Sequence, residues 1–282
     1  MAGKPRALII TAPGINCDLE LGHAFAAAGA EPTSELLETL SREPGRLKAY
    51  DLVGLPGGFS YGDDIAAGRI MGALVAQRLY GALRDCVERG VPMICPCNGF
   101  QIAVQAGLLP GPDRTDDRWP EEAARPTVAL ANNASGRFAD RWTAVEIPRD
   151  TVCAWTRGVA CADPDNQLPS AHGEGRFVAS AAALARLEAG GQVAIRYSAS
   201  ENFNGSAGAV AGICDPSGLV FGLMPHPERY TRFTQHPRWT RIPPAQRAGA
   251  PLGLRVFKNA VKWVIEDRRG AHFEVNASLA PP

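Results

Sequence analysis

The first 110 residues alternate between short apolar runs and segments with helical spacing, and this alternation restricts the possible folds more than any other feature of the chain. Apolar runs predict strands at 7–13, 34–37, 51–55 and 91–95, and helices are expected at 19–28, 70–87 and 99–106. Strands that alternate with helices favour a mostly parallel sheet covered on both faces. In such sheets the loops after the strands lie along one edge, where ligands bind.

Beyond residue 109 the pattern changes to short β-like pieces, expected at 128–130, 142–147, 192–197, 210–214 and 219–224, with a last amphipathic helix at 254–265. The stretch at 110–126, rich in proline, aspartate and arginine, looks like an exposed insertion. A length of 282 residues leaves one or two domains open. The pattern as a whole predicts an α/β fold with a central, mostly parallel sheet flanked by helices and an added antiparallel β portion.

Charge and cysteine usage exclude several classes of protein. The 29 basic and 29 acidic side chains sum to zero, whereas a protein that binds nucleic acid or anionic membranes is expected to carry a basic excess. No apolar stretch reaches membrane-spanning length, and the start does not read as a secretion signal, so we expect a cytoplasmic protein. Seven scattered cysteines argue for reduced thiols rather than a disulfide framework.

Cys97 is the candidate nucleophile. It follows the strand expected at 91–95 and directly precedes the helix expected at 99–106. A strand, a tight turn and a helix form a nucleophile elbow, which pushes the side chain toward the ligand edge of the sheet. The N-terminus of the helix also favours a thiolate. The alternative is a small residue buried at the end of a strand.

A second strand end offers a base. The run at 219–224 leads into Pro225-His226-Pro227-Glu228. A thiol nucleophile needs a base that accepts and returns its proton, and a third group that orients this base. His226 and Glu228 match these two needs, and the flanking prolines restrict the backbone. The alternative for His226 is a solvated or capping residue.

With these residues in view, the chain resembles the class I glutamine amidotransferases, and within them the glutaminase subunits of phosphoribosylformylglycinamidine synthases. Three motifs carry the finer resemblance: Pro-Gly-Gly-Phe-Ser-Tyr-Gly-Asp at 56–63, Ala-His-Gly-Glu-Gly-Arg at 171–176 and Met-Pro-His-Pro-Glu-Arg at 224–229. Further motifs lie, in the order of the family, at 13–18, 97–101, 133–138 and 204–206. The resemblance covers nearly the whole chain and implies one amidotransferase domain over 1–282, with a flavodoxin-like central sheet and insertions near 110–126 and 230–251.

The resemblance implies a mechanism and a set of site residues. Cys97 would attack the side-chain amide of glutamine to give a γ-glutamyl thioester and ammonia, with His226 as acid and base and Glu228 orienting it. The backbone at Gly57, Gly58 and Asn98 would supply the oxyanion hole, although a plain tight turn is the other interpretation of the two glycines. Residues expected to bind glutamine are Gln101, Asn133, Ser135, Phe138 and His172, with His172 and Glu174 in a loop flanked by glycines. His172 lacks metal-like spacing, so no metal is expected.

The resemblance also implies partners. A separate synthetase subunit would use ATP and magnesium to turn formylglycinamide ribonucleotide into the amidine with the ammonia supplied here, and a small adaptor subunit would join them. No Walker-type phosphate loop occurs in the chain, so no cofactor is expected in this subunit. The stretch near 230–251 would shape the partner interface or be a solvated loop.

One departure from the family pattern and two alternative functions remain open. The family usually has glycine two residues before the nucleophile, whereas this chain has Cys95. This difference leaves open the detailed geometry of the nucleophile elbow, and whether Cys95 can form a disulfide with Cys97. A cysteine peptidase or deglycase of the related α/β superfamily would usually have histidine after its reactive cysteine, where this chain has Asn98. A non-catalytic regulatory subunit would not need Cys97, His226 and Glu228 together.

Overall fold

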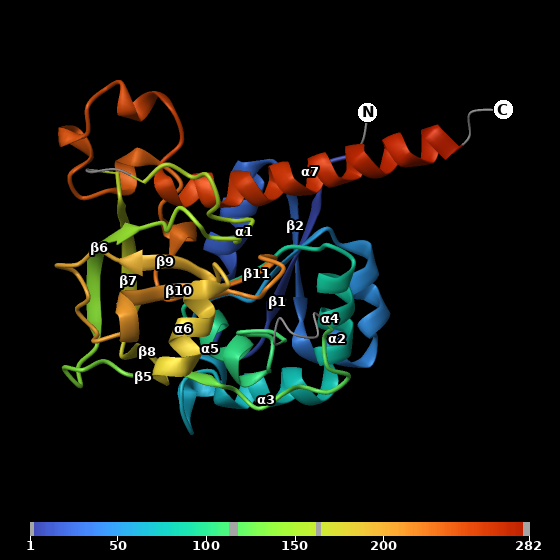
Figure 1. The fold of residues 1–282 in the computed structure, drawn as a ribbon, viewed down its shortest axis with the longest axis horizontal. Helices are drawn as coiled ribbons and strands as arrows, with labels where there is room; N and C mark the ends of the chain where they lie inside the picture. Colours follow the sequence, from blue (N-terminus) through green and yellow to red (C-terminus); the bar gives the residue numbers. More distant parts are fainter. Residues whose placement is uncertain (1–2, 113–117, 162–164, 279–282) are drawn as a thin grey trace.

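The computed structural model describes residues 3–112, 118–161 and 165–278, and for 267–278 the backbone only. Among these residues, nine strands form one sheet in the order β2-β1-β3-β4-β11-β10-β9-β6-β7 (Figure 1). The parallel part contains β1 (Arg6–Thr11), β2 (Glu31–Leu36), β3 (Leu52–Gly54), β4 (Met93–Pro96) and β11 (Val220–Leu223). The antiparallel part contains β10 (Val210–Cys214), β9 (Val193–Tyr197), β6 (Ala139–Glu146) and β7 (Gln167–His172). The expected fold class, a mostly parallel sheet with an added antiparallel portion, is confirmed.

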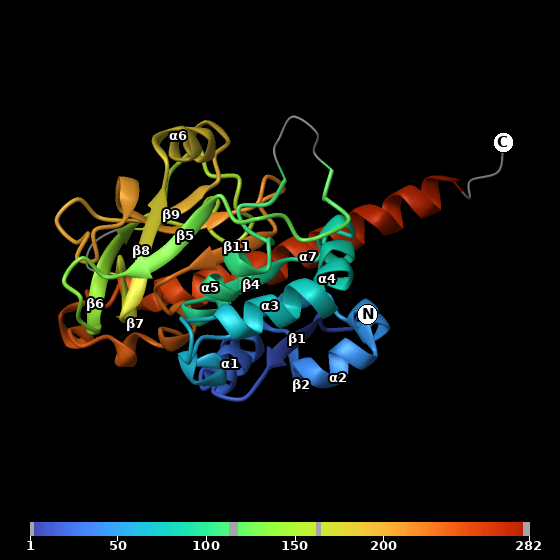
Figure 2. The same ribbon diagram turned by 90° about the horizontal axis from the view of Figure 1, so that it is seen from below.

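Helices cover both faces of the parallel strands. Helices α1 (Asp18–Ala28) and α7 (Leu252–Ser278) lie on one face, and α3 (Arg69–Arg78), α4 (Tyr80–Glu88) and α5 (Asn98–Gln105) lie on the other (Figures 1 and 2). Strand β1 shows why: Leu8 and Ile10 belong to the core beneath α3 to α5, whereas Ala7 and Ile9 belong to the core beneath α1 and α7. Because successive side chains of a strand point to opposite faces, a strand covered on both sides is apolar throughout.

Several elements differ from their sequence-based prediction. The helix expected at 70–87 is broken at Leu79, whose φ of −131° is not helical, so that α3 and α4 are separate helices. Leu79 is buried, and its apolar character therefore gave no hint of the break. Strand β2 begins at residue 31, three residues before the expected start. This start has no signal in the sequence, because the side chains of β2 are largely exposed at the edge of the sheet and lack an apolar pattern. Helices α2 (Leu37–Arg42) and α6 (Ala181–Ala189) were not predicted.

A small second sheet changes the expected position of His172 and Glu174. Strand β5 (Val128–Asn132) pairs antiparallel with β8 (Glu174–Ala179). Only Gly173 separates β8 from β7, which belongs to the large sheet. His172 and Glu174 therefore lie at strand ends, and the expectation that they occupy a loop was wrong. Alternation across Pro169, Gly173 and Gly175 was too irregular to indicate two strands.

The two expected insertions pack against the domain in part. Of the first, 113–117 lie outside the described residues, but Trp119 is buried and Tyr80 donates a hydrogen bond to the carbonyl of Pro120, so the stretch is less exposed than expected. The second begins with the buried Tyr230 and contains three short 3-10 helices, η5 (Phe233–Gln235), η6 (Trp239–Arg241) and η7 (Gln246–Ala248). Within the described ranges, no helix is both long and apolar enough to span a membrane.

Candidate active site

Cys97 stands at a strained turn between β4 and α5. Its φ of 52° and ψ of −109° lie in a region that residues with a Cβ rarely adopt, at a cost of about 1–3 kcal/mol. The backbone N–H of Cys97 donates to the carbonyl of Leu223 on β11 at 2.7 Å, which holds the turn in place. A Cβ on Gly99 would lie 1.9 Å from the carbonyl oxygen of Leu55, so the next turn of chain requires glycine. These contacts present the Cys97 thiol at the edge of the sheet.

The loop after β11 carries His226 and Glu228. Strand β11 is the neighbour of β4, with Leu223 opposite Pro96, so both loops emerge side by side. Nδ1 of His226 pairs with Oε1 of Glu228 at 2.6 Å, and both side chains are buried. A Cβ on Gly57 would lie 2.9 Å from Cε1 of His226 and 3.4 Å from Cβ of Cys97. The imidazole and the thiol therefore meet around Gly57.

The charge state of His226 follows from its neighbours. Burial lowers the pKa of His226, but the carboxylate of Glu228 and the sulfur atoms of Cys97 and Cys17 raise it more strongly. The result is a pKa well above the ordinary value of 6.5. Nε2 of His226 has no hydrogen-bond partner within the described part of the chain. A protonated imidazole with one free nitrogen beside a thiol can hold a thiolate and later return a proton.

Gly57, Gly58 and Asn98 lie around the same point. Gly58 has a φ of 145°, and a Cβ there would lie 2.7 Å from the backbone nitrogen of Asn16. The carbonyl of Gly57 accepts hydrogen bonds from the backbone of Asn16 and Cys17. The N–H groups of Gly58 and Asn98 donate to no other group in the described ranges. Two unpaired N–H groups next to a nucleophile are what an oxyanion hole needs, although this role stays a prediction.

A cavity of about 300 Å³ opens beside Cys97. Of the residues expected to bind glutamine, Gln101, Phe138 and His172 line it. Both ends of the Gln101 amide are already engaged: its nitrogen donates to the carbonyl of Glu174, and its oxygen accepts from the Asn98 side chain at 2.9 Å. Gln101 thereby joins the nucleophile helix to β8.

Asn133 and Ser135 do not line this cavity. Asn133 is buried, and its side-chain nitrogen donates to the carbonyls of His172 at 2.8 Å and Arg137 at 3.0 Å. Ser135 is exposed, and its hydroxyl accepts from the backbone of Arg137 at 3.3 Å. Their positions indicate that they shape the loop next to His172, and direct contact of either with glutamine stays an untested prediction.

His172 is a second buried imidazole at the cavity. Its Nδ1 pairs with Oδ1 of Asn133 at 3.0 Å, and its ring lies 5.4 Å from the ring of Phe203. A Cβ on Gly175 would lie 2.2 Å from this ring, so glycine leaves the space that His172 fills. Burial, together with the nearby charge of His226, lowers the pKa of His172 to about 4. His172 is therefore neutral at physiological pH.

Sequence reasoning missed Cys17 and Arg229. Nη2 of Arg229 donates to Sγ of Cys17 at 3.0 Å, and both residues line the cavity. Each lies inside a motif that carries the family resemblance, at 13–18 and 224–229, and that was the available signal. Cys95, by contrast, is fully buried in β4, and burial raises the pKa of its thiol strongly. Cys95 is therefore a core residue with low reactivity.

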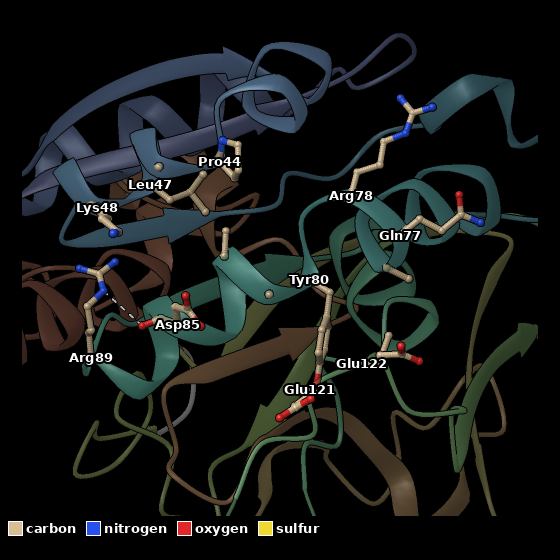
Figure 3. Close-up of a pocket in the computed structure, with 15 residues that line it drawn as sticks. Pro44, Leu47, Lys48, Gln77, Arg78, Tyr80, Asp85, Arg89, Glu121 and Glu122 are labelled. Carbon is tan, nitrogen blue, oxygen red and sulfur yellow. Dashed lines mark hydrogen bonds between the residues drawn. The ribbon is translucent and has the colours of Figure 1, made fainter.

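A larger hollow of about 750 Å³ lies elsewhere, between the 3-10 helix η1 (Pro44–Ala49) and helices α3 and α4 (Figure 3). Tyr80, Asp85 and Arg89 are among its lining residues, and Arg89 donates to the backbone carbonyl of Asp85 at 3.2 Å. It shares no lining residue with the cavity beside Cys97. Its lining mixes acidic and basic side chains and contains no cysteine or histidine, whereas the candidate triad lies at the smaller cavity.

Comparison with known proteins shows the family of the chain. Residues 4–264 match the family described as CobB/CobQ-like glutamine amidotransferase domain. The phosphoribosylformylglycinamidine synthase subunit PurQ of Dehalococcoides mccartyi is 38% identical over 92% of this chain and 98% of that protein. PurQ of Rubrobacter xylanophilus is 43% identical over 78% of this chain and 87% of that protein. Among solved structures, a chain of PurLQS from Thermotoga maritima has 31% identity and a TM-score of 0.66, and the match covers 93% of this chain and 99% of that chain.

Proposed function

Because the chain belongs to the glutamine amidotransferase family and, within it, to the family of PurQ subunits, we propose that its cavity hydrolyses glutamine for a phosphoribosylformylglycinamidine synthase. Cys97 attacks the side-chain amide, and a γ-glutamyl thioester forms as ammonia leaves. Water then releases glutamate. His226 transfers the proton in both steps, and Glu228 holds its ring through Nδ1.

The oxyanion forms on the former amide oxygen of glutamine. The unpaired N–H groups of Gly58 and Asn98, with Gly57 beside them, support a hole at this point, and one such donor contributes about 3 kcal/mol. His172 contributes a neutral ring whose Nε2 is buried without a partner in the described ranges, so it can bind a polar group of the substrate. Phe138 and Gln101 complete the wall.

The ammonia passes to a separate synthetase subunit, which converts formylglycinamide ribonucleotide to formylglycinamidine ribonucleotide. ATP and magnesium bind to that subunit, and a small adaptor subunit completes the assembly. The solved relative from Thermotoga maritima, named PurLQS, supports an assembly of this kind. The stretch near 230–251 lines no part of the cavity in its described residues, which leaves it available for contacts with a partner.

One observation carries the proposal: the strained turn at Cys97 and the His226–Glu228 pair lie at the ends of adjacent parallel strands. The alternative function, that of a peptidase or deglycase, has no comparable support, since a glutamine amidotransferase family matches residues 4–264.

The test uses the glutamine analogue 6-diazo-5-oxo-norleucine and mass spectrometry. We expect a covalent adduct at Cys97 that glutamine suppresses, and no adduct in Cys97→Ala. In the complex with the synthetase, Cys97→Ala should lose glutamine-dependent synthesis and keep ammonia-dependent synthesis. An absence of any adduct, with or without the synthetase, would contradict the proposal. Loss of the ammonia-dependent reaction in Cys97→Ala would contradict the division of labour.

A further inference from the structure

We propose that Cys17, His226 and Glu228 form a binding site for a thiophilic divalent cation such as Zn²⁺, and that this cation inhibits the enzyme. The inhibition, though not the binding, rests on the proposed glutaminase function. Cys17 lies outside the proposed triad, and Zn²⁺ binds to thiolate sulfur, imidazole nitrogen and carboxylate oxygen. All three ligand types are buried here in one place.

The geometry fits a single ion. One ligand atom from each of the three residues lies within 4.8 Å of the others. In tetrahedral zinc sites the metal lies about 2.3 Å from sulfur and about 2.0–2.2 Å from nitrogen or oxygen, which places two ligand atoms about 3.5 Å apart. The present separations run from 2.6 Å between His226 and Glu228 up to at most 4.8 Å, so adjusting them to the zinc value needs side-chain shifts of about 1 Å.

An unpaired polar atom supports the same conclusion. Oε2 of Glu228 is buried and has no hydrogen-bond partner in the described ranges. Buried polar groups normally find a partner, because an unsatisfied one costs about 1–3 kcal/mol. A metal ion would occupy the free lone pair of this oxygen. Nδ1 of His226 and Oε1 of Glu228 lie 2.6 Å apart, and an ion that replaces the proton between them would be bound by both side chains, while that proton passes to solvent.

Arg229 holds the third ligand in place. Its Nη2 donates to Sγ of Cys17 at 3.0 Å, which fixes the sulfur at the cavity. The positive charge of Arg229 is itself offset by Glu20, whose carboxylate lies 3.7 Å away. Cys17 and His226 both line the cavity beside Cys97, so an ion in solution has an entry path.

Binding would block the proposed reaction. A ring nitrogen of His226 that coordinates a metal cannot hold a proton, and an ion between His226 and Glu228 would remove the contact that orients the ring for proton transfer. Removal of the metal by a chelator should restore turnover, because no covalent bond to the protein has changed.

The direct test is a titration of the purified, metal-free full chain with Co²⁺, followed by competition with Zn²⁺. We expect one equivalent to bind with a thiolate-to-cobalt charge-transfer band, and Zn²⁺ to displace it. Cys17→Ser should weaken binding by at least about 100-fold, more than is typical for loss of a supporting residue. Cys161→Ser is the matched control, because Cys161 is a half-buried thiol that donates a hydrogen bond to the carbonyl of Val145. This variant should bind the metal as tightly as the wild type.

Two outcomes would overturn the site. One is a wild-type titration without a thiolate band, and the other is unchanged affinity in Cys17→Ser, which would assign the metal to Cys97 and His226 alone. If Cys17→Ser does not fold, as judged by circular dichroism, X-ray absorption of the zinc-loaded wild type decides instead. It should show one sulfur ligand at about 2.3 Å, and a shell of nitrogen and oxygen only would overturn the site.

Inhibition is measured on the complex with the synthetase. Zn²⁺ should abolish glutamine-dependent synthesis, leave ammonia-dependent synthesis unchanged, and be reversed by a chelator. Metal bound through Cys17 without loss of glutamine hydrolysis would overturn the inhibitory role. A protein that binds the metal but hydrolyses no glutamine in metal-free solution would instead contradict the proposed glutaminase function and leave the metal site standing.

Discussion

The surroundings of the two buried histidines at the cavity differ, and so do their pKa values. His226 follows β11 in the parallel part of the sheet and pairs with a carboxylate, which raises its pKa well above 6.5. His172 ends β7 in the antiparallel part and pairs with the amide of Asn133, and its pKa falls to about 4. Both rings are almost fully buried. Burial alone therefore does not decide protonation, because the paired group determines whether the charged form is stabilised.

The difference separates two tasks within one cavity. The proposed base must change its charge during the reaction, and a carboxylate on the far nitrogen of its ring stabilises the imidazolium. A ring that holds substrate serves best when its charge is fixed. The region around His226 is thus suited to proton transfer, and the region around His172 to binding.

The largest expected effect comes from replacing each histidine by asparagine, which preserves a donor near Nδ1. His226→Asn should lower kcat for glutamine hydrolysis by about 10⁵-fold, whereas His172→Asn should chiefly raise KM and leave kcat within about tenfold. Steady-state kinetics of the assembled complex measure both. Equal losses of kcat in the two variants would remove the distinction between the two regions.

The next effect comes from the partner of His226. Glu228→Gln keeps the shape of the side chain but removes the charge that raises the pKa of His226. We expect kcat to fall by about 10⁴-fold with little change in KM. Ammonia-dependent synthesis in the same preparation is the control for folding. A Glu228→Gln enzyme with wild-type kcat would show that the carboxylate does not orient or stabilise the imidazole.

The smallest effect is on stability, and its sign differs between the histidines. His172 has a folded pKa of about 4 against 6.5 in an unfolded chain, so the unfolded chain binds more protons between these values. Stability should therefore fall by about 3 kcal/mol as pH drops from 6.5 to 4. His226 has a raised pKa, so its contribution is complete below 6.5 and is lost as pH rises through the folded value.

Denaturant unfolding of the wild type and of His172→Asn across pH 4 to 9 checks these signs. In His172→Asn, the free energy of unfolding should fall less steeply than in the wild type as pH drops from 6.5 to 4, and its fall at alkaline pH should be unchanged. In Glu228→Gln, the fall at alkaline pH should be reduced and the fall at acid pH unchanged. If stability still falls equally steeply toward acid pH in His172→Asn, another group accounts for the fall, such as His236, whose pKa is also lowered by burial.

Parts of this arrangement could be predicted from local spacing. The strand, turn and helix around Cys97 follow from an apolar run with glycine and a helical pattern directly after it, and the run at 219–224 placed His226 at a second strand end. Exposed or irregular elements escaped prediction. Strand β2 is largely exposed, and the change of sheet at Gly173 follows no periodicity, so His172 was expected in a loop.

The sequence by itself determined the class of fold and singled out the candidate nucleophile and base, because residue type and periodicity act over a few neighbouring positions. Only the tertiary structure decided which groups surround them. It brings Arg229 to Cys17 across 212 positions of the chain, uses Asn133 to hold His172 rather than to line the cavity, and buries Cys95 two residues before the candidate nucleophile Cys97. Strand order and the packing of loops at the sheet edge set these contacts, and with them the local dielectric and charge that determine each pKa.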